Sequence, residues 1–484
     1  MLSQPTSIVR GLLLLVTVET LLSVPLLSWE LAIGSHMLLG IVFSLFAAVG
    51  IISVIWRWGT ELKGLFDKIA FRLSTIPTGK WLMLCIGLGI ILRVGWVWLY
   101  PAPQRSDQAT YFALAQDVVL KHRYGISNGG LAYWPPGYPI FLCVWFLVFG
   151  TKTWVPLIAN LCLFSGIVAV VDRLACRISG LPSARLATLL LVPWPTLAMI
   201  AGFAGKEMLV VFLLCLVLLV YSASEDRQDS RTPFTFLAGL LLGFTILTQP
   251  AFQLFPFVLG AYEYFRKRLW TSAVARILSV TVGLCIVILP WTLRNHRVLG
   301  AWVPISTNGG DVLYRANNPW ATGGYTPRGE QDLSTLDEVT RGRVGMHLGL
   351  RWILTNPRKF LLLGLHKQIL FLGDDAQGAY ETLKRGLGIG GIRYAVWKGI
   401  SNLYWWLLWS LISLALVVRR RLELGNEALH ATIILAVLYL LVIHSVFESG
   451  AKYHEPLMGF LAVLAAQVAA PSRHLSGSSE SHSL

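Results

Sequence analysis

Charged residues are scarce in this chain. Only 13% of its 484 residues are Asp, Glu, Lys or Arg, whereas 55% are hydrophobic and the mean hydropathy is +0.63. This composition excludes an ordinary soluble globular protein. Apolar runs long enough to cross a hydrocarbon core of about 30 Å recur along the chain, so we expect an all-α polytopic membrane protein.

Acidic residues are in the minority: 25 Asp and Glu accompany 40 Lys and Arg, and the formal net charge is +15. The basic residues form short clusters beside apolar spans, and no soluble basic domain is present that could hold a duplex. We therefore expect no nucleic acid as a partner. Clusters of this kind orient helices in a membrane and contact anionic membrane lipids.

Cysteine is also rare, and no Cys-x-x-Cys pair occurs. Disulfides and thiolate metal sites are therefore not expected, and the cysteines should serve as small buried hydrophobic residues. All six lie inside or at the ends of apolar segments: Cys85, Cys143, Cys162, Cys176, Cys215 and Cys285.

The apolar segments predict about twelve transmembrane helices. The segment 57–80 carries five basic residues and should be cytoplasmic, which places the following polar segment outside the cytoplasm. At 13 residues, 138–150 is too short to cross comfortably, so we expect a re-entrant or interfacial helix there. The predicted spans are 9–27, 31–56, 81–100, 154–172, 184–202, 208–222, 234–249, 251–265, 272–290, 401–418, 430–447 and 456–470.

We expect three parts in the chain. Residues 1–56 form an N-terminal transmembrane hairpin, 57–470 form the main transmembrane region, and 471–484 form a disordered, Ser-rich cytoplasmic tail. The main region has two large outer loops, at about 101–153 and 291–400. The second loop contains an amphipathic segment, 356–373, that is expected to lie at the membrane interface.

The most unusual polar segment is 106–139, SDQATYFALAQDVVLKHRYGISNGGLAYWPPGYP. A membrane protein keeps such a segment only where it reaches water or builds a site. Asp107 shares a helix face with Tyr111 and has two interpretations. With Ser106 as the cap, it complements the helix dipole; alternatively, it is a carboxylate placed to accept a proton.

Five blocks carry a resemblance to a known family. They are D-x-x-x-Y-x-x-x-A from Asp107 with YWPPGYP (133–139), GFAGKEMLVVFLL (202–214), GLLLGFTILTQPAFQLFPF (239–257), PWTLRNHRVLGAWVPISTNGGDVLYRANNP (290–319) and ESGAKYHEPLMGFLAVLAA (448–466). In this order they resemble the GT-C superfamily of membrane glycosyltransferases. The closest branch is the dolichyl-phosphate-mannose protein mannosyltransferase-like group, which includes bacterial aminoarabinose transferases. The likeness covers most of 81–470.

The resemblance implies an inverting transferase with a polyprenyl-phosphate-linked sugar as donor and an active site facing the periplasm of a bacterial inner membrane. It makes 57–470 the catalytic region and Asp107 the general base. Lys206, Arg294 and Lys452 become candidates for the donor phosphate, because a departing phosphate needs fixed cations in a poorly solvated pocket.

Further residues in or near the same blocks offer aromatic rings, amides and acids suited to binding substrate. No spacing specifies a metal site, and a divalent metal ion is left open, with Asp107, Glu207, His454 and Glu455 offering ligands. The substrate-binding candidates are Tyr111, Tyr133, Trp134, Glu207, Asn308, Tyr314, Asn317, Glu448, Tyr453 and His454.

Two departures from the family pattern bear on the substrate. Lys452 stands where the family usually has Arg, so a bidentate fork is replaced by a point charge. Asp107 is followed by Gln108, where protein mannosyltransferases have paired acids. The acceptor is therefore expected to be a lipid or a glycan, with protein O-mannosylation as an alternative.

The alternative from another class is a transporter or a flippase of cell-envelope glycolipids. Such proteins show repeated halves and ionisable or broken positions near the centres of several spans. This chain shows no internal repeat, and its ionisable residues concentrate at span ends and in loops. The pattern therefore favours the transferase.

The predicted topology can be tested directly. A tag inserted between Thr322 and Gln331 should be labelled by a membrane-impermeant reagent in intact cells, because this segment belongs to the second outer loop. Labelling only after the membrane is permeabilised would reverse the predicted orientation.

Overall fold

The computed structural model describes six stretches of the chain, and the predicted tail lies outside them apart from Pro471. Within these stretches the regular structure is helical, and the β pairing consists of an isolated bridge between Ile126 and Gly130. The expected all-α class is confirmed. The described stretches are 4–33, 37–126, 130–223, 231–326, 329–418 and 424–471.

Seven helices in the described residues are long and apolar enough to cross a membrane. Large apolar side chains such as Phe46, Trp56 and Leu278 are exposed on two of them, as a lipid-facing surface requires. The protein is thus an integral, multi-pass membrane protein, although about twelve spans are not confirmed. The seven are α1 (Gln4–Ile33), α2 (Met37–Ser74), α3 (Thr78–Leu99), α6 (Val155–Leu191), α11 (Trp270–Leu299), α16 (Gly391–Val417) and α17 (Glu427–Val446).

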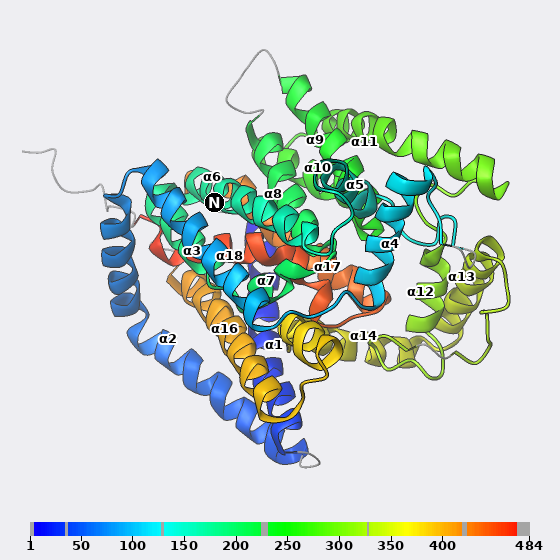
Figure 1. Cartoon of the computed structure of the whole chain (residues 1–484). Helices are drawn as coiled ribbons and strands as arrows, with labels where there is room; N and C mark the ends of the chain where they lie inside the picture. Colours follow the sequence, from blue (N-terminus) through cyan, green and yellow to red (C-terminus); the bar gives the residue numbers. More distant parts are fainter. Residues whose placement is uncertain are drawn as a thin grey trace, which may run out of the picture.

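The shorter helices lie within the bundle and at one side of it. As predicted, α5 is a 13-residue helix after the YWPP turn, and α14 covers the predicted amphipathic segment. In Figure 1, α12, α13 and α14 form a group at one side of the bundle. The shorter helices are α4 (Ser106–Lys121), α5 (Gly137–Phe149), α7 (Pro195–Met199), α8 (Glu207–Ala223), α9 (Arg231–Thr248), α10 (Phe255–Lys267), α12 (Asn308–Ala316), α13 (Glu338–Thr355), α14 (Pro357–Leu372), α15 (Gln377–Ala379) and α18 (Met458–Ala466).

The predicted spans 154–172 and 184–202 correspond to two helical segments that meet at a kink within α6. The kink lies at Gly180, whose φ is 80°, with Pro182 close behind; α6 ends at Leu191, and the short α7 and the 3-10 turn Ile200–Gly202 follow. Arg185 is fully buried and forms a 2.9 Å ion pair with Asp172 across this kink. A buried pair neutralises its charge, so Arg185 gives no orientation signal.

The basic segment after the N-terminal hairpin is helical up to Ser74. It belongs to α2, which has a kink at Trp58. Lys63 is buried and donates to Asp67 at 2.7 Å and to the carbonyl of Ala470 at 3.1 Å. In Figure 1, α2 runs along one edge of the molecule.

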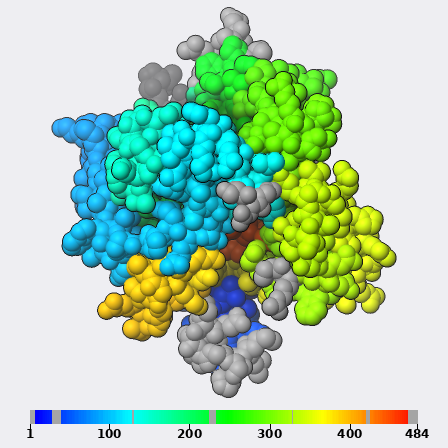
Figure 2. Space-filling model, turned by 45° about the vertical axis from the view of Figure 1, so that its right-hand side comes forward, coloured from blue at the N-terminus to red at the C-terminus, as the bar shows by residue number. Residues whose placement is uncertain are grey.

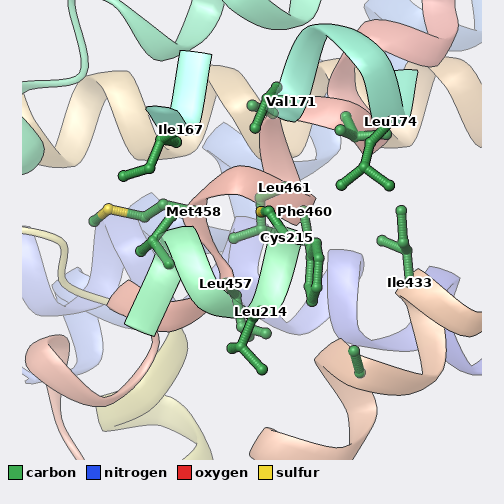
Figure 3. Close-up of a cluster of buried hydrophobic side chains, with 14 of the residues drawn as sticks. Ile167, Val171, Leu174, Leu214, Cys215, Ile433, Leu457, Met458, Phe460 and Leu461 are labelled. Atoms are coloured by element: carbon green, nitrogen blue, oxygen red, sulfur yellow. The ribbon is translucent and has the colours of Figure 1, made fainter. Parts of the chain in front are cut away.

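The centre of the core is α18, whose nine residues are all buried. Figure 3 shows Met458, Phe460 and Leu461 of this region among side chains of α6, α8 and α17. A Cβ at Gly459 would lie 2.4 Å from the sulfur of Cys215, so only glycine permits this approach. The segment that immediately precedes α18 is therefore held firmly in the middle of the protein.

Helices α9 and α11 approach each other through glycines. A Cβ at Gly239 would lie 2.3 Å from the carbonyl oxygen of Val280, and one at Gly283 would lie 2.5 Å from that of Phe236. Small residues at such positions let helix backbones pack closely in a membrane.

We predict that Gly283→Ala lowers stability by about 1–3 kcal/mol, because the methyl group forces the two backbones apart. The measurement is thermal unfolding of the purified protein in detergent. Gly87→Ala in α3 is the matched control, since a Cβ there meets nothing within 4 Å. Equal unfolding temperatures for the two variants would contradict the close packing.

Candidate active site

A pocket forms where four distant parts of the chain meet, namely α4, the start of α8, the turns before α18 and the region after α15. Its empty volume is about 430 Å³, counting the space open to solvent. Figure 2 shows a hollow between the cyan segment with α4 and the yellow-green α12–α14, with the red C-terminal part visible inside. The pocket is lined by Asp107, Gln108, Tyr111, Ile200, Phe203, Gly205, Glu207, Gln377, Glu381, Arg385, Lys452 and Glu455.

An ion pair joins two of the predicted site residues. Lys452 Nζ donates to Asp107 Oδ2 at 3.1 Å, and each side chain remains more than a third exposed. Burial opposes ionisation of Asp107, but Lys452 and, more weakly, Lys206 and Arg385 hold its pKa below the usual value. Asp107 is therefore a carboxylate at neutral pH.

Lys206 is a second cation near the Asp107–Lys452 pair. It directly precedes α8 and is half-buried. Burial lowers its pKa, and the nearby Lys452 adds to this effect, while Glu207 and Asp107 oppose it. Lys206 and Lys452 are thus two ammonium groups near Asp107, with Glu207 as a second acidic group beside them.

Gln104 links two of the walls. Its Nε2 donates to the carbonyl of Gly202 at 2.9 Å, and its Oε1 accepts from the backbone N–H of Ala204 at 2.8 Å. The neighbouring Arg105 donates from Nε to the carbonyl of Gly386 at 3.3 Å. The linker before α4 is thus tied both to the loop before α8 and to the turn after α15.

The start of α4 differs from the expected cap. Arg105, not Ser106, is the N-cap residue, and its backbone N–H donates to Oε1 of Gln108 at 3.4 Å. Asp107 still lies in the first turn, where its charge complements the helix dipole. This stabilising role and a role in the pocket are compatible.

Aromatic rings support the apolar side of the pocket. Tyr111 is almost fully buried and meets Trp134 and Tyr138 edge to face, with ring centroids 5.6 Å apart in both pairs. A Cβ at Gly137 would lie 2.3 Å from the hydroxyl oxygen of Thr248, so this turn packs against the end of α9. The YWPPGYP turn therefore packs against Tyr111 and holds its ring in position.

A second polar network lies beside the pocket. Arg315 donates to Glu448 at 2.9 Å and to Asp311 at 2.9 Å, and Tyr133 donates to Asp311 at 2.5 Å. The hydroxyl of Tyr453 donates to Glu448 at 3.1 Å. Tyr453 is adjacent to Lys452 in sequence, so the network connects α12 to the pocket.

Arg294, a candidate for the donor phosphate, is not among the pocket residues. Its guanidinium donates to the carbonyls of Leu131 and Tyr124, both at 2.6 Å, and lies over the rings of Trp291 and Tyr124. These contacts hold the loop between α4 and α5. The structure therefore gives Arg294 a positioning role.

Three predicted substrate residues are bonded to other parts of the protein, two of them to the backbone. Asn317 is fully buried and donates to the carbonyls of Leu313 and Val446. Tyr314 accepts from the backbone N–H of Gln331 at 2.7 Å, and Asn308 accepts from a neighbouring hydroxyl. None of the three lines the pocket described above.

His454, a candidate for binding substrate or a metal ion, lies inside the protein. It is fully buried, its Nε2 is 3.0 Å from Asp375 Oδ1, and its ring stacks on Trp405 at 4.2 Å. Its Nδ1 is 2.5 Å from the carbonyl oxygen of Phe371. It thus binds the turns before α18 to the end of α14.

Sequence reasoning missed several pocket residues. Gln377, Glu381 and Arg385 follow α14 in a stretch that includes a π-helical turn, Tyr380–Gly386. The available signal was a run of charged residues, 374–385, placed directly after an amphipathic helix. Among the described residues, no group of three or more His, Cys, Asp or Glu is arranged to hold a metal ion.

No protein-family model and no curated protein matches the sequence. Solved structures similar to this chain include the oligosaccharyltransferase AglB from Archaeoglobus fulgidus with an inhibitory peptide and a dolichol-phosphate. It is 11% identical, with a TM-score of 0.47, over 80% of this chain and 49% of that one. ArnT from Cupriavidus metallidurans bound to undecaprenyl phosphate is 16% identical, with a TM-score of 0.42, over 81% and 78%.

This chain spans about half the length of AglB.

We predict that Gln104→Leu exposes Lys206 to amine-reactive reagents. Loss of two hydrogen bonds frees the loop before α8, and labelling of Lys206 by acetic anhydride should rise about tenfold, as followed by mass spectrometry. Gln368→Leu is the control, because Gln368 bonds Ser445 at 3.1 Å and lines no part of the pocket. An unchanged labelling rate in Gln104→Leu would show that the two hydrogen bonds of Gln104 do not hold the loop before α8.

Proposed function

We propose that the protein is a membrane glycosyltransferase. It moves a sugar, with inversion, from a polyprenyl-phosphate-linked donor to a lipid or glycan acceptor, and residues 57–470 form its catalytic region. The observation that carries the proposal is the Asp107–Lys452 pair with Lys206 beside it, in a pocket open to solvent. Two cations and an ionised carboxylate are the groups that phosphate departure and hydroxyl activation require.

The donor phosphate would bind between Lys452 and Lys206, with Arg385 at the rim. Both lysines act on Asp107 electrostatically, as does Arg385. Lys452 and Arg385 line the pocket, and Lys206 lies in sequence between the lining residues Gly205 and Glu207. In a poorly solvated site these fixed charges stabilise the negative charge that grows on the leaving phosphate. Lys452 supplies a point charge and needs no bidentate geometry to do so.

Asp107 would act as the general base. In the free protein Lys452 holds its pKa low, which makes the carboxylate a weak base. A bound phosphate competes for Lys452 and thereby raises the basicity of Asp107 when the donor is in place. The acceptor hydroxyl then gives its proton to Asp107 as its oxygen bonds to the anomeric carbon, and polyprenyl phosphate leaves from the opposite face.

The acceptor is proposed to be a lipid or a glycan at the periplasmic face of a bacterial inner membrane. Asp107 is followed by Gln108, and both line the pocket. The motif of paired acids found in protein mannosyltransferases is therefore missing from the residues that face the acceptor. Tyr133, Arg315 and Glu448 form a hydrogen-bond network that reaches the pocket through Tyr453. In the proposal this network supports the part of the site that binds the acceptor.

The deciding variant is Asp107→Asn, which keeps the shape of the side chain but removes the base. Transfer should fall at least 100-fold, the scale of a lost general base. Cellular glycolipids and glycans would be compared by mass spectrometry after membrane insertion has been verified. Asp117→Asn on the same helix is the control, because Asp117 forms an ion pair with the exposed Lys121 at 2.7 Å and does not line the pocket.

Wild-type product levels in Asp107→Asn, with stable insertion, would remove Asp107 as the base. Loss of product in both variants would instead indicate that α4 had been damaged.

A further inference from the structure

Carboxylates line the pocket together with the cations. Besides Asp107 they are Glu207, Glu381 and Glu455, and Glu381 is paired with Arg385 at 2.8 Å. They come from the start of α8, the π-helical turn and the 3-10 turn Glu455–Leu457. Glu455 interacts electrostatically with both of the others, so the three lie close together.

Two of these carboxylates have buried oxygens without a partner in the described residues. Glu455 is 1% exposed, and its Oε1 receives no hydrogen bond. Glu381 is 6% exposed; its Oε1 accepts from Gln377 at 2.7 Å and from Arg385 at 2.8 Å, but its Oε2 receives nothing. Buried polar atoms in folded proteins are nearly always bonded, so these oxygens indicate a ligand that brings hydrogen-bond donors.

We infer that Glu381 and Glu455 form a subsite that binds hydroxyl groups of the donor's sugar. The inference rests on the proposed function and deepens it, because it assigns different groups of one pocket to the two parts of one substrate. A polyprenyl-phosphate sugar carries an anionic phosphate next to a ring of hydroxyl donors. The cations fit the first part and the unpaired carboxyl oxygens fit the second.

The environment of Glu455 supports hydroxyl groups as the ligand. Burial raises its pKa well above the usual value, and the nearby Glu207 and Asp375 add to this effect. A neutral carboxyl group both donates and accepts, as a sugar hydroxyl does. It thus matches a polyol without the desolvation cost of a second buried charge.

The test compares binding of two lipids that differ only in the sugar. The probes are undecaprenyl phosphate and undecaprenyl phosphate carrying glucose, mannose, galactose or arabinose. Dissociation constants would be measured by native mass spectrometry on the purified full chain, for wild type, Glu381→Gln and Glu455→Gln. Glu330→Gln, in an exposed part of the outer loop, is the matched control.

The wild type should bind at least one glycosylated lipid more tightly than the bare lipid. Each pocket variant should lose about tenfold affinity for that glycosylated lipid, the scale of a lost hydrogen bond to a charged or strongly polar group. Glu455→Gln should keep its affinity for undecaprenyl phosphate within about twofold, which also shows that it is folded. Because Glu381→Gln also releases Arg385, its effect is taken as the loss on the glycosylated lipid relative to the bare lipid.

Three other outcomes are decisive. If wild type binds undecaprenyl phosphate but no sugar adds affinity, or if the variants bind the glycosylated lipid as wild type does, the subsite is wrong and the proposed function stands. If Mg²⁺ or Mn²⁺ tightens binding of the bare lipid and Glu455→Gln abolishes that effect, the carboxylates hold a cation instead. If wild type binds neither class of lipid, the proposed function itself fails.

Discussion

Burial of α18 is the constraint on which the candidate site depends. The nine residues of this helix are all buried between α6, α8, α16 and α17, and Gly459 touches Cys215. So short a helix has little stability of its own, because nucleation is costly, and tertiary packing must hold it. The same packing fixes the turns before α18, which is why Lys452 and Glu455 have defined positions at the pocket.

Charge balance then decides what the pocket can hold. Asp107 and Lys452 satisfy each other in the free protein, but each keeps more than a third of its side chain exposed. Such a pair is weakly bound and can be exchanged for contacts with a ligand. By contrast, Asp172 and Arg185 in α6 are fully enclosed, and their pairing serves the fold alone.

The predicted site residues differ in the groups that they contact. Polar residues of the outer loops were expected to bind substrate, but Arg294, Asn317 and His454 satisfy backbone carbonyls and a buried carboxylate. Irregular chain within a membrane protein leaves many such groups to be bonded. Composition alone does not distinguish a side chain that serves a ligand from one that serves the backbone.

The sequence by itself determined the all-α membrane class, the unusual polar segment after α3, and the candidates Asp107, Lys206, Glu207 and Lys452. Each of these conclusions rests on local pattern: apolar length, or a charged group at the boundary of an apolar run. Only the tertiary structure decided that Asp107 meets Lys452, 345 positions away, and that a π-helical turn adds its acid and base to the pocket. Those contacts depend on how helices pack, and packing is set by side-chain shapes across the whole bundle, which no local pattern records.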